Sequence, residues 1–282
     1  MMKWRNVQCA VILALGTTGC TNRLEAFTHG DQTRHYSLYK PEGLPDNAPL
    51  VFMLHGYQGL ARLYQSSMGF DDVADEHGFA IVYPQGTYDD NFIPHWNAGL
   101  EISEVNDIGF LTELAKQLQI DHNFDPERTF TSGISNGGFM SYTLACESSD
   151  VFKGMASIIG TMSGHTWNNC TPENPMPVLQ ISGLIDTVVP MDGTMSTEGG
   201  WGGAPDIDAV VNFWVEQNGC TESDTQETAD NIEGVHHTTC EGNNEVWHYK
   251  LSDMGHEVPS EENYNLEATE KIWEFFSQQS TD

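Results

Sequence analysis

The residues with the clearest chemical potential lie in the stretch FTSGISNGGFM, residues 130–140, which contains the pattern Gly-x-Ser-x-Gly around Ser135. A serine hydroxyl becomes a useful nucleophile only when it is held in place beside a base. The strand-forming residues before Ser135 and the helix-forming residues after it predict a strand-to-helix corner. Gly133 and Gly137 would permit the tight turn that such a corner needs. The pattern also fits an ordinary glycine-rich turn. Whether the chain also supplies a base and an acid must decide between a nucleophile and such a turn.

A serine nucleophile of this kind needs a histidine base and an acid that orients the base, in the chain order serine, acid, histidine. Asp186 follows an apolar, strand-like run at 176–183, while Asp192 and Asp253 are weaker rivals. Four histidines come after Asp186: His236, His237, His248 and His256. The order Ser135, Asp186 and His256 is preferred, because His256 follows a predicted strand at 245–253 and Gly255 frees the turn. We expect His248 inside that strand and the pair at 236–237 on a surface loop.

The third requirement is a pair of donors for the oxyanion of a tetrahedral intermediate. The N–H group after the nucleophile belongs to Asn136. The second donor comes from the loop after an early strand in this arrangement. The segment LHGYQG, residues 54–59, occupies that place, and we assign the N–H of Tyr57, with Gln58 as the alternative.

Strand-like and helix-like segments alternate along the chain, which predicts one domain built on a mostly parallel sheet with helices on both faces. The alternating residues 34–40 predict an antiparallel edge strand ahead of the parallel ones. Strands are expected at 49–56, 79–86, 128–134, 154–160, 176–183 and 245–253. Helices are expected at 106–120, 136–148, 205–219 and 260–279. The candidate residues thus follow strand ends, where parallel sheets gather functional groups.

The first twenty residues read as an export signal, with Lys3 and Arg5 before a short apolar run. TTGC, residues 17–20, resembles a bacterial lipobox, which would make Cys20 the lipidated first residue and the sole route to a membrane. The remaining residues, 21–282, form the catalytic domain. The chain has 11 Lys and Arg against 41 Asp and Glu, a net charge of −30. This charge argues against nucleic acid as a partner.

Four cysteines follow the predicted signal: Cys146, Cys170, Cys220 and Cys240. In an exported chain they predict two disulfides, for which three pairings exist. The pairing of neighbours, Cys146 with Cys170 and Cys220 with Cys240, is favoured because each bond closes a modest loop; free buried thiols are the alternative. No cysteine or histidine spacing is typical of a zinc site, and no other metal frame is present.

Taken together, the motifs resemble a known group over nearly all of the mature chain. They are LHGYQG, HWNAG (95–99), VNDIGFLTELAKQL, DPERTFTSGISNGGFMSYTLACE, ISGLIDTVVPMDG and FWVEQNGC. Their order is similar to that in the bacterial polyhydroxybutyrate depolymerase and feruloyl esterase group, which consists of secreted serine esterases of the α/β-hydrolase fold. The resemblance implies Ser135 as nucleophile, Asp186 as acid and His256 as base. It also implies that Cys220 and Cys240 pair.

The chain departs from the group at a few positions. Ser182 stands where the group often has histidine before the acid, and Val258 replaces an aromatic near the base. The cysteine pair often found after WNAG is absent. Trp96 and Trp201 are the aromatics that we expect at the cleft, with Trp201 on the glycine-rich loop EGGWGG, residues 198–203.

These observations predict an exported serine esterase that works through an acyl-enzyme and needs no cofactor. Its substrates would be hydroxyalkanoate polyesters and oligomers, or hydroxycinnamoyl and acetyl esters of plant polysaccharide. Two alternatives have a different function on the same fold. One is a peptidase, which usually carries a long N-terminal gating domain that is not seen here. The other is a non-catalytic surface lipoprotein that binds a ligand, against which the order Ser135, Asp186, His256 argues.

Overall fold

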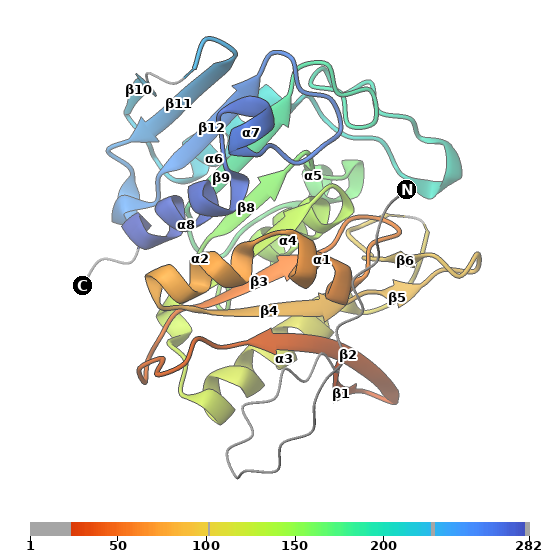
Figure 1. The fold of residues 1–282 in the computed structure, drawn as a ribbon. Helices are drawn as coiled ribbons and strands as arrows, with labels where there is room; N and C mark the ends of the chain where they lie inside the picture. The colour runs from red at the N-terminus through yellow and green to blue at the C-terminus, as the bar shows by residue number, and fades with distance from the viewer. Residues whose placement is uncertain (1–23, 101, 227–228, 280–282) are drawn as a thin grey trace, which may run out of the picture.

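The computed structural model describes residues 24–100, 102–226 and 229–279 (Figure 1). The predicted signal and Cys20 therefore lie outside the described residues. These residues form one ten-stranded sheet in the order β1-β2-β4-β3-β7-β8-β9-β12-β11-β10. The strands are β1 (Glu25–His29), β2 (Gln32–Tyr39), β3 (Leu50–Leu54), β4 (Ala80–Gln85), β7 (Thr129–Ile134), β8 (Met155–Ile158), β9 (Val178–Gly183), β10 (Glu222–Gln226), β11 (Ile232–Thr238) and β12 (Val246–Leu251).

The middle of the sheet is parallel, from β4 through β3, β7, β8 and β9 to β12. Both edges are antiparallel: β1 and β2 pair beside β4, and β11 and β10 pair beside β12. A parallel sheet places the carboxyl ends of its strands at one edge, so the loops after β3, β7, β9 and β12 meet there. This arrangement confirms the predicted α/β-hydrolase architecture.

Helices cover both faces of the sheet (Figure 1). They are α1 (Ala61–Ser67), α2 (Phe70–His77), α3 (Asp107–His122), α4 (Asn136–Glu147), α5 (Gly164–Asn169), α6 (Ile207–Gln217), α7 (Glu261–Tyr264) and α8 (Ala268–Gln279). One core cluster joins α3, α4 and α6 to the sheet, and the other joins α2 and α8 to its opposite face. Strand β3 serves both, because Phe52 belongs to the first cluster and Val51 to the second. Burial on both faces accounts for the continuous apolar run of this strand.

The short hairpin of β5 (Thr87–Tyr88) and β6 (Pro94–His95) follows β4 and lies apart from the main sheet. Helices α1 and α2, this hairpin and strand β1 were not predicted. The expected closing helix is broken: α7 ends at Tyr264, and the next residue, Asn265, has a left-handed backbone with φ of 57° before α8 begins. None of the helices in the described ranges is long and apolar enough to cross a membrane.

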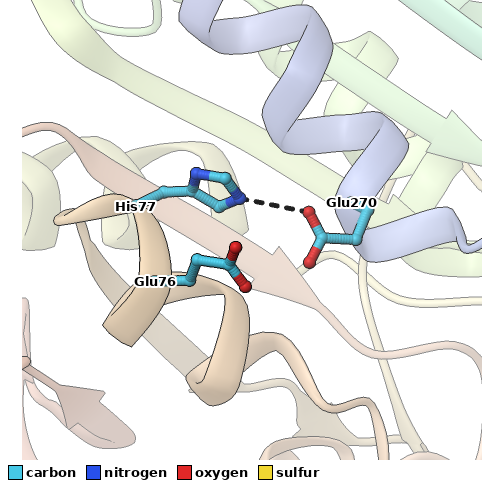
Figure 2. Close-up of side chains that lie close together, drawn as sticks. All are labelled: Glu76, His77 and Glu270. Carbon is cyan, nitrogen blue, oxygen red and sulfur yellow. Dashed lines mark hydrogen bonds and ion pairs between the residues drawn. The ribbon is translucent and has the colours of Figure 1, made fainter.

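Helices α2 and α8 meet through polar side chains at the surface (Figure 2). His77 Nε2 lies 3.2 Å from a carboxylate oxygen of Glu270, and Glu76 lies beside them. The potential ligand atoms of these three exposed side chains lie within 4.8 Å of one another. The pairing of His77 with Glu270 joins the two helices, which contribute no residue to the site described below.

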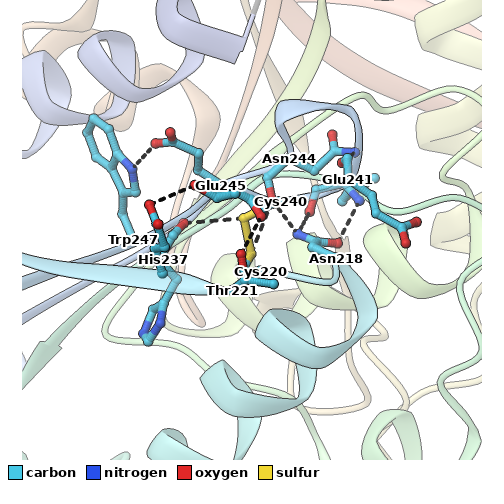
Figure 3. Close-up of a disulfide and its surroundings, with 12 residues drawn as sticks. Asn218, Cys220, Thr221, His237, Cys240, Glu241, Asn244, Glu245 and Trp247 are labelled. Carbon is cyan, nitrogen blue, oxygen red and sulfur yellow. Dashed lines mark hydrogen bonds between the residues drawn. A yellow bond between two sulfur atoms is a disulfide. The ribbon is translucent and has the colours of Figure 1, made fainter.

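Both favoured disulfides are present, Cys146–Cys170 and Cys220–Cys240. The first joins the last turn of α4 to the residue after α5. The second joins the residues that flank the hairpin of β10 and β11 (Figure 3). Beside it, the side-chain amide of Asn218 accepts from Met176 N at 3.2 Å and donates to Met176 O at 2.7 Å.

Candidate active site

Ser135 lies between β7 and α4 with a backbone conformation that non-glycine residues rarely adopt, φ 52° and ψ −117°. The surrounding glycines are required by close contacts. A Cβ at Gly133 would lie 2.3 Å from the carbonyl of Gly137, and one at Gly137 would lie 2.3 Å from the carbonyl oxygen of Leu54. The corner is therefore packed directly against the end of β3, and the strain at Ser135 marks a functional position.

His256 bridges Ser135 and Asp186. Its Nε2 lies 2.9 Å from Ser135 Oγ, and its Nδ1 lies 2.7 Å from Asp186 Oδ2. In the neutral tautomer with the proton on Nδ1, that N–H donates to the carboxylate and the serine hydroxyl donates to Nε2. The His256 side chain is 24% exposed and that of Asp186 is 2% exposed. The base can thus reach a bound molecule while the acid remains buried.

Asp186 is held by its own loop. Its Oδ1 accepts the backbone N–H groups of Val188 at 2.7 Å and Val189 at 2.9 Å, which leaves Oδ2 directed at His256. The rivals Asp192 and Asp253 have other partners: Asp192 accepts from Thr194, and Asp253 accepts from the amide of Asn231. The structure therefore brings together the three residues that the chain order had selected.

Asn136 directly follows this corner, and Gly56, the residue before Tyr57, packs against it, since a Cβ at Gly56 would lie 3.5 Å from Ser135 Cβ. Asn136 is the first residue of α4, where backbone N–H groups have no partner within the helix. Neither the N–H of Tyr57 nor that of Asn136 donates to another group among the described residues. The alternative donor, Gln58 N–H, is taken, since it donates to the carbonyl of Pro94 at 2.9 Å. Of Tyr57 and Gln58, the two candidates for the second oxyanion donor, Tyr57 is the one whose backbone N–H has no acceptor among the described residues.

The two tryptophans expected at the cleft differ. Trp201 packs edge-on against the ring of Tyr57, with centroids 5.1 Å apart at an angle of 75°. It is only partly buried. Trp96 is 0% exposed and belongs to the core. The expectation that Trp96 lies at the cleft is therefore wrong, because its side chain is buried and contacts His55 in the loop after β3.

Several residues around the site were not singled out from the sequence. Tyr64 Oη accepts the N–H of Gly56 at 2.9 Å and fixes the loop before Tyr57. The hydroxyl of Tyr57 donates to Asp89 at 3.0 Å, and burial raises the pKa of that phenol. His55 is fully buried beside them. Their contacts join residues far apart in the chain, so no spacing pattern indicates them.

The remaining candidate histidines are structural. His236 is not on a surface loop as expected: it lies in β11, is 8% exposed and stacks on Trp247 with centroids 3.6 Å apart. His237 follows it in the same strand. Burial lowers the pKa of His248, and this residue lies inside β12 as predicted. None of the three contacts Ser135.

A cavity of about 700 Å³ opens at the other edge of the sheet, before β7 and β9. Its basic residues already have acidic partners, since Arg128 pairs with Asp125 and Lys153 with Glu127. It contains none of the predicted site residues. The chemistry of the chain therefore gathers at the carboxyl ends of the strands.

Comparison with known proteins identifies the family of the chain. The family model described as "Esterase PHB depolymerase" matches residues 34–211, which is more than half of the chain. The chain belongs to this family. This membership confirms the predicted resemblance. The matched region contains Ser135 and Asp186, and His256 lies beyond it.

The curated relatives of the chain carry several activities in their names. The chain is 29% identical to feruloyl esterase C of Emericella nidulans over 255 residues, which cover 86% of this chain and 83% of that one. It is 29% identical over 155 residues to poly(3-hydroxyalkanoate) depolymerase C of Paucimonas lemoignei, 53% of this chain and 37% of the relative. The chain spans 34% to 48% of the length of several other curated relatives it matches.

Among solved structures, the acetyl xylan esterase from Aspergillus awamori superposes with a TM-score of 0.65 at 16% identity, covering 90% of this chain and 99% of that one. The carboxylesterase of Bacillus cereus gives a TM-score of 0.59 at 15% identity and covers 87% and 94% of the two chains. At this level of identity the likeness supports the α/β-hydrolase fold alone.

Proposed function

We propose that the chain hydrolyses carboxylic esters through an acyl-enzyme formed on Ser135. The observation that carries this proposal is the hydrogen-bonded series Ser135, His256 and Asp186 beside two unused backbone donors. Family membership supports it, and so do the esterases among the relatives. The peptidase alternative is supported by fold likeness alone, since two acylaminoacyl peptidases superpose with TM-scores of 0.56 and 0.57 at 17% and 18% identity.

In the first half-reaction, Ser135 Oγ attacks the ester carbonyl carbon while His256 Nε2 takes the hydroxyl proton. The imidazolium that forms is stabilised by Asp186, whose other oxygen is held by two backbone N–H groups. The carbonyl oxygen becomes an oxyanion and accepts from the N–H groups of Tyr57 and Asn136. The positive end of the α4 dipole adds to this stabilisation.

The tetrahedral intermediate then breaks its bond to the alcohol oxygen, and His256 gives its proton to that leaving group. Water enters, loses a proton to His256 and attacks the acyl carbon. Collapse of the second intermediate releases the acid and returns the proton to Ser135. Besides the ester and water, every group named in these steps belongs to this chain.

For the substrate, we propose an ester of hydroxycinnamic or acetic acid on a polysaccharide, or a hydroxyalkanoate oligomer, since the relatives are named for these classes. Trp201 and Tyr57 offer an aromatic wall for the acyl or alcohol group next to the oxyanion donors. Leu184, Ile185 and Val188, which flank the loop of Asp186, are exposed by 45%, 59% and 52%. They would extend an apolar rim beside the nucleophile.

The test is a comparison of initial rates on methyl ferulate, an acetylated sugar and a hydroxybutyrate oligomer. Wild type and Ser135→Ala are measured on all three substrates, and we expect the variant to lose at least 10³-fold in kcat. Trp201→Ala should raise KM for methyl ferulate selectively, because an aromatic pair contributes about 0.5–1.5 kcal/mol. Equal rates for wild type and Ser135→Ala would refute the mechanism, and equal effects of Trp201→Ala on every ester would refute the aromatic wall.

We also propose export, since two disulfides fit an oxidising compartment. Lipidation of Cys20 would retain the protein at the bacterial envelope. Fractionation of cells that express wild type and Cys20→Ser separates the outcomes. Release of the variant alone supports the lipid, release of both supports a secreted protein, and retention of both in the cytoplasm contradicts export.

A further inference from the structure

The segment 94–96, at the end of the β5–β6 hairpin, contacts the loop that carries Tyr57 on both sides of that residue. Pro94 O accepts the N–H of Gln58 at 2.9 Å, and the indole N–H of Trp96 donates to His55 O at 2.9 Å. The ring of Trp96 also packs on the ring of His55, with centroids 4.9 Å apart. The backbone of the Tyr57 loop is therefore held from this one segment.

The same segment holds Asn136, which carries the other donor. Trp96 N donates to Asn136 Oδ1 at 2.7 Å, and Asn136 Nδ2 donates to Trp96 O at 3.0 Å. Both residues are 0% exposed. The side-chain amide is thus paired with the main chain of Trp96 through two hydrogen bonds, which fixes the first residue of α4 and the direction of its free N–H.

The residue after Trp96 is held by a buried ion pair. Asp107 Oδ2 accepts the N–H of this residue, Asn97, at 2.8 Å. Its Oδ1 accepts from Arg34 Nη2 at 2.6 Å, and both side chains are almost fully buried. Because each partner is enclosed, the position of Trp96 is determined by the core and not by solvent-exposed contacts.

We propose that Trp96 is a positioning residue that sets the distance between the Tyr57 and Asn136 N–H donors. This inference rests on the proposed ester hydrolysis. Trp96 does not touch the substrate: its indole controls one donor loop and its backbone controls the other donor. An oxyanion site works only when its donors lie about 2.7–3.1 Å from the developing charge, and a misplacement of about 1 Å can cost about 10²-fold in rate.

The test compares Trp96→Phe with Trp214→Phe. Both tryptophans are 0% exposed, so each change removes one buried indole N–H and part of one ring. Trp214 Nε1 has no hydrogen-bond partner among the described residues, whereas Trp96 Nε1 holds His55 O. Each kcat is expressed per active site, counted from the endpoint of fluorophosphonate labelling of Ser135. A partly unfolded preparation therefore does not imitate a slower enzyme.

For Trp96→Phe we expect kcat per labelled site to fall about tenfold with KM for a short soluble ester nearly unchanged. Affinity for a trifluoromethyl ketone, which forms a tetrahedral adduct with an oxyanion, should fall by the same factor. Trp214→Phe should leave both quantities within about twofold of wild type. Equal behaviour of the two variants would overturn the proposal.

A second pair of variants tests the same proposal if Trp96→Phe does not fold. Asn136→Ala retains the backbone N–H and removes only the amide that pairs with Trp96. Asn218→Ala removes another amide that is 0% exposed and paired with the main chain of Met176. This amide also donates to Asn244 O at 2.8 Å (Figure 3). A fall in kcat per site in Asn136→Ala alone supports the proposal, and the same kcat in both refutes it. If Ser135→Ala kept its activity, the proposed function itself would fail, which is a separate result.

Discussion

His55 is a buried histidine in which one ring nitrogen accepts a hydrogen bond and the other donates one. Nε2 accepts the N–H of Gly86 at 2.9 Å, and the Nδ1–H group donates to Gly56 O at 2.8 Å. Burial lowers the pKa of His55 to about 4. The folded protein therefore keeps this ring neutral at a pH where a histidine in the unfolded chain, with a pKa of about 6.5, is already charged.

This difference gives a pH dependence with a definite sign. Between about pH 6.5 and pH 4 the unfolded chain binds a proton at His55 and the folded chain does not, so stability falls as pH falls through this range. The free energy of unfolding of wild type should exceed that of His55→Asn at pH 7.5. The gap should narrow by about 2 kcal/mol on going to pH 5. Urea titrations of both proteins measure it, and a constant gap would contradict the assignment.

At the residue scale, the sequence indicated which residues could carry out the chemistry better than it indicated which side chains are buried. Ser135, Asp186 and His256 could be chosen because their order and their place after strands follow from local patterns. The burial of Trp96 could not, because it depends on His55 and Asn136, which lie 41 and 40 residues away and form its hydrogen bonds. An aromatic residue near a motif is equally compatible with a cleft and with a core until such contacts are known.

Each disulfide closes a loop of the chain, and the two loops are similar in length. Cys146 and Cys170 are separated by 24 residues, and Cys220 and Cys240 by 20. The loop-entropy account predicts that loss of either bond lowers the free energy of unfolding by about 3 kcal/mol.

Two double variants, Cys146→Ala with Cys170→Ala and Cys220→Ala with Cys240→Ala, serve as controls for each other. Both should lose a similar stability in urea titrations and keep kcat at low temperature, because neither bond contacts Ser135, Asp186 or His256. A thiol assay of unfolded wild type should find the four described cysteines oxidised. Loss of kcat in a fully folded double variant would show that its bond positions the site.

At the scale of elements, the central strands could be predicted and the edges could not. Strand β3 is buried on both faces, so its apolar run is unmistakable. Strand β10 has the sequence ESDTQ and is mostly exposed, which resembles a loop in any hydrophobic pattern. Its partner β11 was missed because only Ile232 among its buried positions is a large apolar side chain, the others being Gly234 and His236, and His236 was misplaced with it. Acidic residues on such an edge protect it against pairing with other chains.

Across the whole molecule, acidic residues outnumber basic ones by 41 to 11. Six Lys and Arg side chains of the described residues lie within ion-pair distance of carboxylates. Most of the acidic groups therefore face water and one another. A net charge this far from zero keeps a protein soluble but destabilises the compact state through repulsion.

Added salt should consequently stabilise the folded protein. Screening shortens the reach of charge repulsion from about 30 Å at 0.01 M ionic strength to about 8 Å at 0.15 M. We expect Tm to rise between 0.01 and 0.3 M NaCl at pH 7.5 and then to level off, at about 2–4 °C for each kcal/mol of repulsion removed. Sodium sulfate at equal ionic strength is the control, since screening predicts the same Tm and exclusion of sulfate from the surface predicts a higher one. A Tm that falls with NaCl would mean that the few ion pairs stabilise the fold more than the unpaired carboxylates destabilise it.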